Sequence, residues 1–326
     1  MREPAFWWRA SGLTSGLLSP LAAVYGAVAA SRMNRPGHNV GIPVICVGNP
    51  TLGGAGKTPV AIAVAQILDS AGKKPFMLSR GYGGAFAGPV RVDPARHSAA
   101  DVGDEPLLLA RVAPTIVSRD RPAGADAARA AGAGVVVMDD GFQNPGLRKS
   151  RSILVVDGRR GIGNGQVFPA GPLRAPLQPQ LQSAQAMLVI GAGEAGERVA
   201  AQARELAVFH GRLEPDAQAL AALKGKPVLA FAGIGDPEKF FRTLRDAGIE
   251  IRAAIPFPDH HRYSRSEADD LVGQAARDGL VAVTTEKDMA RLARQDDLTA
   301  LASSARVLPV TLKVTEDAAF RRWLLG

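Results

Sequence analysis

An α/β fold, with a parallel sheet covered by helices on both faces, is the class that this 326-residue sequence predicts. Short, wholly apolar runs such as 43–47, 135–138 and 153–156 recur along the chain, and helical patterns separate them. Such runs are typical of strands buried on both faces, and their alternation with helices is typical of parallel sheets. At ~150 residues per domain, the length indicates about two domains.

The composition excludes several classes of protein. Hydrophobic residues make up 46% of the chain and charged residues 21%, which is enough apolar material for a core and excludes wholesale disorder. Cys46 is the single cysteine, so an internal disulfide is impossible. The net charge of +8 fits nucleic acid, anionic lipid or a phosphorylated substrate and does not choose among them.

An uncharged segment, residues 10–31, lies near the N-terminus and is flanked by Trp7, Trp8 and arginines. Such flanks suit the headgroup zone of a bilayer. A cleaved signal peptide is disfavoured, because export would separate the nucleotide motif described below from ATP. A buried helix and a membrane-surface helix remain open, and a transmembrane span ranks third. We predict that residues 1–35 form a membrane-associated segment.

The first of these strands leads into a phosphate-binding loop, because residues 43–58 read PVICVGNPTLGGAGKT. Strand, glycine turn, Gly-Lys-Thr and helix follow in the order that a Walker A loop requires. Thr51 departs from the pattern, which expects glycine there. Lys57 would reach the β/γ-phosphates and Thr58 would bind Mg²⁺. The sequence therefore predicts ATP binding by Thr51, Gly53, Gly54, Ala55, Gly56, Lys57 and Thr58.

The next apolar run, 135–138, ends in Asp139 and Asp140. A phosphate-binding loop needs an acidic residue at the end of a neighbouring strand to hold Mg²⁺. Two adjacent carboxylates repel unless a cation is near, which favours a metal site over an ordinary turn. We predict Thr58, Asp139 and Asp140 as the metal-binding groups of a P-loop NTPase-like sheet.

A glycine motif at 191–196, GAGEAG, follows the apolar run 186–190 and matches the dinucleotide-binding pattern, with Glu214 further on. One match in a chain with 36 glycines is weak. We interpret it as an ordinary strand–turn–helix, so an NAD-dependent enzyme is a minor alternative.

The second half repeats the strand–helix alternation without a phosphate loop. Strands are predicted at 226–230, 249–255 and 281–284, and Asp236 caps a helix that runs to about Ala247. Thr285 and Asp288 read as a helix cap. We predict a P-loop domain at 36–215 and a smaller α/β domain at 216–326 that closes over the active-site cleft.

Several segments together resemble one family, and they occur in the family's order. They read GNPTLGGAGKTP (48–59), LSRGYGG (78–84), VGDEP (102–106), DDGFQN (139–144), GNGQVFPAGPLR (163–174), FAGIGDPEKFF (231–241), FPDHH (257–261) and TTEKD (284–288). They are similar to tetraacyldisaccharide 4'-kinase, the lipid A 4'-kinase of Gram-negative bacteria. Asn144 departs from the family, which usually has histidine there.

The resemblance implies transfer of the ATP γ-phosphate to the 4'-hydroxyl of a tetraacylated disaccharide 1-phosphate, giving lipid IVA at the cytoplasmic face of the bacterial inner membrane. It also implies that Asp104 removes the hydroxyl proton with His260 hydrogen-bonded to it. Lys57 would neutralise charge during transfer. Because Asp104 and His260 are far apart in the chain, we expect a cleft between the two domains. Arg80 and Arg119 or Arg121 are candidates for the substrate phosphate.

The main competing prediction is a membrane-associated P-loop ATPase or switch protein without a lipid substrate. The absence of a guanine-reading motif and the presence of a second domain disfavour it. A nucleic-acid binder is disfavoured by the low aromatic content, 5%, and by the lack of a recognisable module. We predict a lipid disaccharide phosphate substrate and a membrane surface as partners, with no nucleic acid and no obligate protein partner.

Overall fold

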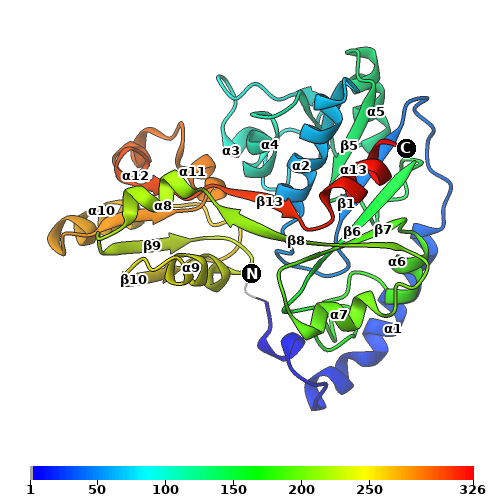
Figure 1. Cartoon of the computed structure of the whole chain (residues 1–326), viewed down its shortest axis with the longest axis horizontal. Helices are drawn as coiled ribbons and strands as arrows, with labels where there is room; N and C mark the ends of the chain where they lie inside the picture. Colours follow the sequence, from blue (N-terminus) through cyan, green and yellow to red (C-terminus); the bar gives the residue numbers. More distant parts are fainter. Residues whose placement is uncertain (1–2) are drawn as a thin grey trace.

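The computed structural model describes residues 3–326 and contains two sheets, one of nine strands and one of four. Figure 1 shows the smaller sheet with its helices beside one edge of the larger sheet. In the nine-stranded sheet the central strands are parallel and the two outermost pairs are antiparallel. Its order is β13 (Val310–Val314), β8 (Ala207–Pro215), β7 (Ala186–Ile190), β6 (Arg151–Asp157), β1 (Val44–Gly48), β5 (Val135–Asp139), β2 (Pro75–Ser79), β4 (Thr115–Val117) and β3 (Val90–Arg91).

Helices cover both faces of the large sheet, because alternate residues of each central strand point to opposite faces. Ile45 and Val47 of β1 pack in one core with α2, α4 and α13, whereas Val44 and Cys46 pack in the other with α5, α6 and α7. The helices of this part are α1 (Leu13–Met33), α2 (Lys57–Ser70), α3 (Ala99–Val102), α4 (Asp104–Leu109), α5 (Arg121–Ala130), α6 (Leu177–Gln182), α7 (Glu194–Ala200) and α13 (Asp317–Leu325), with a 3₁₀ turn η1 (Ala5–Trp8).

The smaller sheet is wholly parallel and is also covered on both faces. Its order is β10 (Ile251–Pro256), β9 (Val228–Ala232), β11 (Val281–Thr284) and β12 (Arg306–Val307). One face holds α8 (Ala217–Leu223) and α9 (Pro237–Asp246), and the other holds α10 (Arg265–Arg277), α11 (Glu286–Leu292), η2 (Asp296–Leu298) and α12 (Thr299–Ser304). The predicted α/β class and the second, smaller α/β unit are confirmed.

The chain crosses between the two units twice, at neighbouring points. It leaves the large sheet after Pro215 of β8 and returns at Val310 of β13, and these two residues pair in the antiparallel register. Helix α13 then packs Phe320 and Leu324 into the core of the large sheet. The range expected for the smaller domain, 216–326, therefore includes a C-terminal segment, from Val310 onward, that belongs structurally to the larger sheet.

The N-terminal helix α1 lies mostly on the surface. Within residues 3–326 it is the one helix long and apolar enough to cross a membrane, judged by length and composition. Its buried residues, Ser15, Ala22 and Gly26, face the protein, and Gly26 lies against Pro176. The opposite face is an exposed apolar stripe of α1, made of Leu13, Leu17, Leu21, Val24 and Val28. The structure therefore does not bury this helix in a core.

Candidate active site

The loop between β1 and α2 has the backbone that a phosphate-binding loop needs. Gly53 and Gly56 have φ angles of 98° and 88°, in the left-handed region that glycine adopts without strain. Gly56 is also the N-cap of α2 and supplies no side chain to its first amides. Those amides and the helix dipole therefore remain available to an anion. Thr51 is not among the residues with positive φ, so the missing glycine causes no strain there.

Thr51 is held by its neighbours. Its carbonyl accepts hydrogen bonds from the side-chain Nδ2 of Asn49 at 2.7 Å and from Nε of Arg174 at 2.9 Å. Arg174 also donates two hydrogen bonds to Asp140, at 2.9 and 3.1 Å. The GPLR segment therefore ties the phosphate loop to the acidic end of β5. The sequence alone indicates no role for Arg174, although this residue ends the segment at 163–174 that resembles the family.

Asp139 and Asp140 stand at the end of β5, beside the end of β1, because Asp139 pairs in register with Val47 of β1. The Thr58 hydroxyl lies 3.4 Å from Oδ2 of Asp139, while Oδ1 of Asp139 is buried without a hydrogen-bond partner. Burial, aided by Glu105, raises the pKa of Asp139 to about 7. An orphaned oxygen on a buried carboxylate beside a threonine hydroxyl is a donor set suited to Mg²⁺.

Asp140 is differently engaged from its neighbour. Its Oδ2 lies 3.7 Å from Nζ of Lys57, and Arg174 binds both of its oxygens. Burial alone would raise the pKa of Asp140, but the charges of Lys57 and Arg174 outweigh it and hold that pKa well below its ordinary value. Burial lowers the pKa of Lys57, and Asp140 partly opposes this shift. Asp140 therefore balances two cations.

Asp104 and His260 meet across the two units, as expected. Asp104 opens α4 and is 3% exposed, and His260 lies in the loop after β10. Nδ1 of His260 lies 3.2 Å from Oδ1 of Asp104. Burial would raise the pKa of Asp104, but the hydrogen bond from His260 and the charge of Arg291 hold it well below its usual range.

His260 has an unusual backbone and a defined ring position. Its φ of 54° is uncommon for a non-glycine residue. Its ring packs against Tyr82, with centroids 4.8 Å apart. Burial lowers the pKa of His260, but the hydrogen bond and charge of Asp104 outweigh burial and raise it above its ordinary value. His261 instead bonds Glu267 at 3.0 Å, so only the first histidine of FPDHH faces Asp104.

The Thr285-Asp288 cap is confirmed, and its helix does more than the sequence indicated. The Asp288 amide donates to Oγ1 of Thr285 at 3.2 Å. Lys287 from the same turn pairs with Glu105 at 2.6 Å. Arg291, one turn later, binds Asp104. Both α11 cations therefore reach into the larger unit beside the Asp104–His260 pair.

The phosphate loop, the acidic end of β5 and His260 line one cavity of about 720 Å³, and Asp104 lies directly behind His260. Gly54 and Gly235 meet across it, where a Cβ on Gly235 would stand 2.8 Å from the Gly54 nitrogen. Two ion pairs bridge the same interface, Lys239–Asp157 at 2.9 Å and Arg160–Asp236 at 3.1 Å. The expected cleft between the two units is present.

Of the other residues that the sequence pointed to, some line the cavity and others make local contacts away from it. Arg80 and Arg121 line the cavity, whereas Arg119 donates to the Gly84 carbonyl at 3.3 Å. Asn144 is exposed, and its side chain accepts from the Gly146 amide at 2.7 Å in a local turn.

The dinucleotide-like glycines have a packing role. The Gly196 amide donates to the Gly158 carbonyl at 2.6 Å, and a Cβ on Gly193 would stand 2.5 Å from the same oxygen. They allow the turn after β7 to contact the turn after β6. Glu214 pairs with Arg212 on its own strand.

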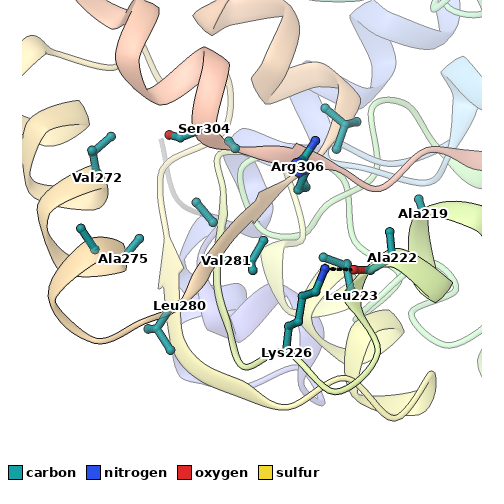
Figure 2. A pocket seen from close by; sticks show the side chains of 14 residues that line it. Ala219, Ala222, Leu223, Lys226, Val272, Ala275, Leu280, Val281, Ser304 and Arg306 are labelled. Atoms are coloured by element: carbon teal, nitrogen blue, oxygen red, sulfur yellow. Dashed lines mark hydrogen bonds between the residues drawn. The ribbon is translucent and has the colours of Figure 1, made fainter.

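A second cavity, of about 790 Å³, lies at the opposite end of the smaller sheet's strands (Figure 2). Lys226 at its rim donates to the Ala222 carbonyl at 3.0 Å. Among the described residues its lining is mostly alanine, leucine and valine, with no carboxylate, histidine or cysteine. Of these two cavities in the described residues, the first combines a phosphate loop with groups able to move a proton.

The chain is similar to proteins of one family along nearly all of its length. The family model described as LpxK, tetraacyldisaccharide-1-P 4'-kinase, matches residues 14–326. The tetraacyldisaccharide 4'-kinase of Nitrobacter hamburgensis is 56% identical, over 99% of this chain and 97% of that one. That of a Methylobacterium species is 58% identical, over 98% and 95%. A crystal structure of LpxK from Aquifex aeolicus in complex with ATP matches with a TM-score of 0.74 and 25% identity, covering 96% of this chain and 98% of that one.

Proposed function

The chain belongs to the tetraacyldisaccharide-1-P 4'-kinase family, and on this premise we propose which groups of its cleft carry out the transfer. It is a kinase that transfers the γ-phosphate of ATP to the 4'-hydroxyl of tetraacyldisaccharide 1-phosphate, which forms lipid IVA in lipid A biosynthesis. A P-loop protein without a lipid substrate is not favoured. The observation that carries the residue assignment is that the phosphate loop and His260, which is held by Asp104, line one cleft.

For the nucleotide, we assign the phosphates to the amides of residues 53–58 and to Lys57. Thr58 and Asp139 would hold Mg²⁺, which supplies charge neutralisation at the β- and γ-phosphates. The unpartnered Oδ1 of Asp139 supports this assignment. Asp140 is committed to Arg174 and Lys57, so its main role in this proposal is to keep those two cations in place.

For proton removal, the geometry favours His260 over Asp104 as the group that faces the substrate. Oδ1 of Asp104 accepts from the Glu105 amide at 2.9 Å and from His260, and Oδ2 accepts from Arg291. The carboxylate is buried and fully engaged, whereas His260 lines the cavity. Asp104 would hold the proton on Nδ1, so Nε2 of His260 would accept the hydroxyl proton.

For the lipid, we propose that the apolar stripe of α1 inserts into the cytoplasmic face of the inner membrane. The η1–α1 segment is tied to the P-loop unit, because the Trp7 indole donates to the Pro169 carbonyl at 3.0 Å. The anchored segment would therefore hold the cleft close to a lipid substrate. Arg80 and Arg121 line that cleft and form no ion pair within residues 3–326, so either could bind the substrate's 1-phosphate.

Two assays test these assignments. With ATP labelled at the γ-phosphate, Mg²⁺ and the tetraacyl disaccharide 1-phosphate, the protein should produce a doubly phosphorylated lipid; hydrolysis of ATP without labelled lipid would contradict the function. Replacing Leu13, Leu17 and Leu21 by glutamate should reduce binding to anionic vesicles. Unchanged vesicle binding would place the membrane contact elsewhere.

A further inference from the structure

Helix α11 places a buried cation behind the Asp104–His260 pair. Arg291 is 5% exposed, its Nε donates to Oδ2 of Asp104 at 2.7 Å, and its Nη2 lies 2.5 Å from the same oxygen. We propose that Arg291 is a positioning residue for phosphoryl transfer, which holds Asp104 as an oriented anion so that Asp104 can fix the ring of His260. This inference rests on the proton-accepting role proposed for His260.

The first support is the orientation that the contacts impose on Asp104. An ionised carboxylate has two oxygens and about four acceptor sites. Oδ1 accepts from His260 and from the Glu105 amide, whereas Oδ2 accepts from Nε of Arg291, with Nη2 of Arg291 in ion-pair contact. The guanidinium therefore selects which oxygen faces the histidine. A carboxylate without Arg291 would have one oxygen free to rotate toward other donors.

The second support is the anchoring of Arg291 itself. Its Nη1 donates to Oδ1 of Asp288 at 2.8 Å and to the Gly233 carbonyl at 2.6 Å. Asp288 is in turn held by the Gly233 amide at 2.9 Å and by the Tyr263 hydroxyl at 2.8 Å. The planar guanidinium is thus bound on both edges, a geometry that a lysine ammonium cannot reproduce.

The third support is the charge balance around the pair. The groups that face Asp104, His260 and Arg291 are Glu105 on α4, Lys287 and Asp288 on α11, Asp259 beside the histidine, and Tyr263. Glu105 and Lys287 pair with each other at 2.6 Å. Arg291 is therefore the cation that compensates Asp104 and Asp288 directly.

A purely structural tie between α4 and α11 would predict a different outcome from a positioning role. The imidazole of His260 must be neutral to accept a proton, so turnover falls at low pH as His260 becomes protonated. Without the positive charge of Arg291, the negative charge of Asp104 is no longer compensated. It then stabilises the protonated form of the His260 imidazole more strongly. The low-pH limb of kcat/KM should then move to higher pH, whereas a loss of packing alone would lower activity at every pH.

The experiment compares full-length Arg291→Gln, Arg291→Lys and a control, Arg277→Gln, on the exposed end of α10. For Arg291→Gln we expect kcat to fall about 10-fold or more, KM for ATP to stay within about twofold, and the low-pH limb to rise by about one pH unit. Arg291→Lys keeps the positive charge, so the low-pH limb of its kcat/KM profile should not move. Its kcat should lie between those of the unmodified protein and Arg291→Gln. The control should match the unmodified protein.

The proposal is overturned if Arg291→Gln keeps its kcat, or if it loses activity equally at every pH without a shift of the limb. Circular dichroism and binding of an ATP analogue report whether each variant is folded. If Arg291→Gln does not fold, Arg291→Lys decides. A reduced kcat with the limb and the KM for ATP both unchanged supports the proposal. An unchanged kcat, a moved limb, or a KM for ATP that changes together with kcat overturns it. Turnover retained in His260→Ala would instead contradict the proton route under the proposed function.

Discussion

Two strand–glycine turn–helix units meet across the cleft, β1 with α2 and β9 with α9, and their helix starts differ. Gly56 caps α2 without a side chain, whereas Asp236 caps α9 and accepts from the Lys239 amide at 3.3 Å. A carboxylate at the N-cap satisfies the amides and repels an anion, while a glycine leaves them free. In our proposal, the same local fold therefore binds phosphate on one side of the cleft, while on the other side its helix start is occupied by a carboxylate.

The side chains around the two turns extend this contrast. Lys57 follows Gly56 and lies near Asp140, inside the larger unit. Asp236 instead pairs with Arg160, so its charge bridges the two units. The smaller unit contributes to the cleft through side chains on its loops and on α11, whereas the larger unit contributes loop backbone together with side chains such as Lys57 and Asp139.

The largest effect is expected from a substitution in the phosphate-binding loop. Lys57→Ala should lower kcat/KM by about 100-fold or more, because the ammonium stabilises charge that develops on the transferred phosphoryl group. Lys73→Ala, in the exposed turn after α2, is the matched control and should be neutral. Steady-state phosphate transfer to the lipid measures both, and near-normal transfer by Lys57→Ala would show that the loop does not bind the triphosphate.

The next effect concerns the groups on the opposite wall. His260→Ala should reduce kcat by about 100-fold while ATP binding stays intact, since a general base contributes to chemistry and not to nucleotide affinity. In the unmodified protein the low-pH limb of kcat/KM should lie above the ordinary histidine value, because Asp104 raises the pKa of His260. His261→Ala, which removes the ring bonded to Glu267, should keep that limb; a pH profile without such a limb would argue against His260.

A smaller effect is expected at Asp236, which both caps helix α9 and forms an ion pair with Arg160. Asp236→Ala removes the cap of α9 and the partner of Arg160, and should cost about 1–2 kcal/mol of stability and raise KM for ATP. Asp216→Ala removes the cap of α8, which accepts from the Ala219 amide at 2.7 Å, without a contact to Arg160. Thermal unfolding should show both losses, whereas KM should rise only for Asp236→Ala; equal KM values would mean that the bridge does not serve the cleft.

The smallest effect tests the departure from the loop pattern. Thr51→Gly restores the usual glycine, but the carbonyl at this position is already held by Asn49 and Arg174. We expect KM for ATP to change by no more than about twofold, because backbone position and not the side chain sets the loop. A large rise in KM would show that the threonine side chain contributes to nucleotide binding.

Local patterns predicted most of the fold and the phosphate side of the site. The strands at 186–190 and 281–284 were expected at the bounds observed, because short and mainly apolar runs indicate buried strands. The loop at 53–58 could be found because its glycines, lysine and threonine are contiguous. The return of β13 to the large sheet was missed, since strand pairing between distant segments leaves no local signal.

The side of the cleft that holds Asp104, His260 and Arg291 was harder to predict from the sequence. The family resemblance indicated Asp104 and His260, but nothing in the spacing of α11 showed that Arg291 would reach Asp104, 187 residues away. The same limit applies to Arg174, whose partner Asp140 lies 34 residues earlier. Residue type and motif were enough to suggest Asp104 as the proton acceptor. Choosing His260 instead required the structure, in which both oxygens of the Asp104 carboxylate already accept hydrogen bonds.

A crystal structure with a non-hydrolysable ATP analogue and the tetraacyl disaccharide 1-phosphate tests the central claim most directly. The account predicts the γ-phosphate over the amides of residues 53–58 and the sugar's 4'-oxygen within about 3 Å of Nε2 of His260. A 4'-oxygen against another group, with His260 turned away from the substrate, would contradict it.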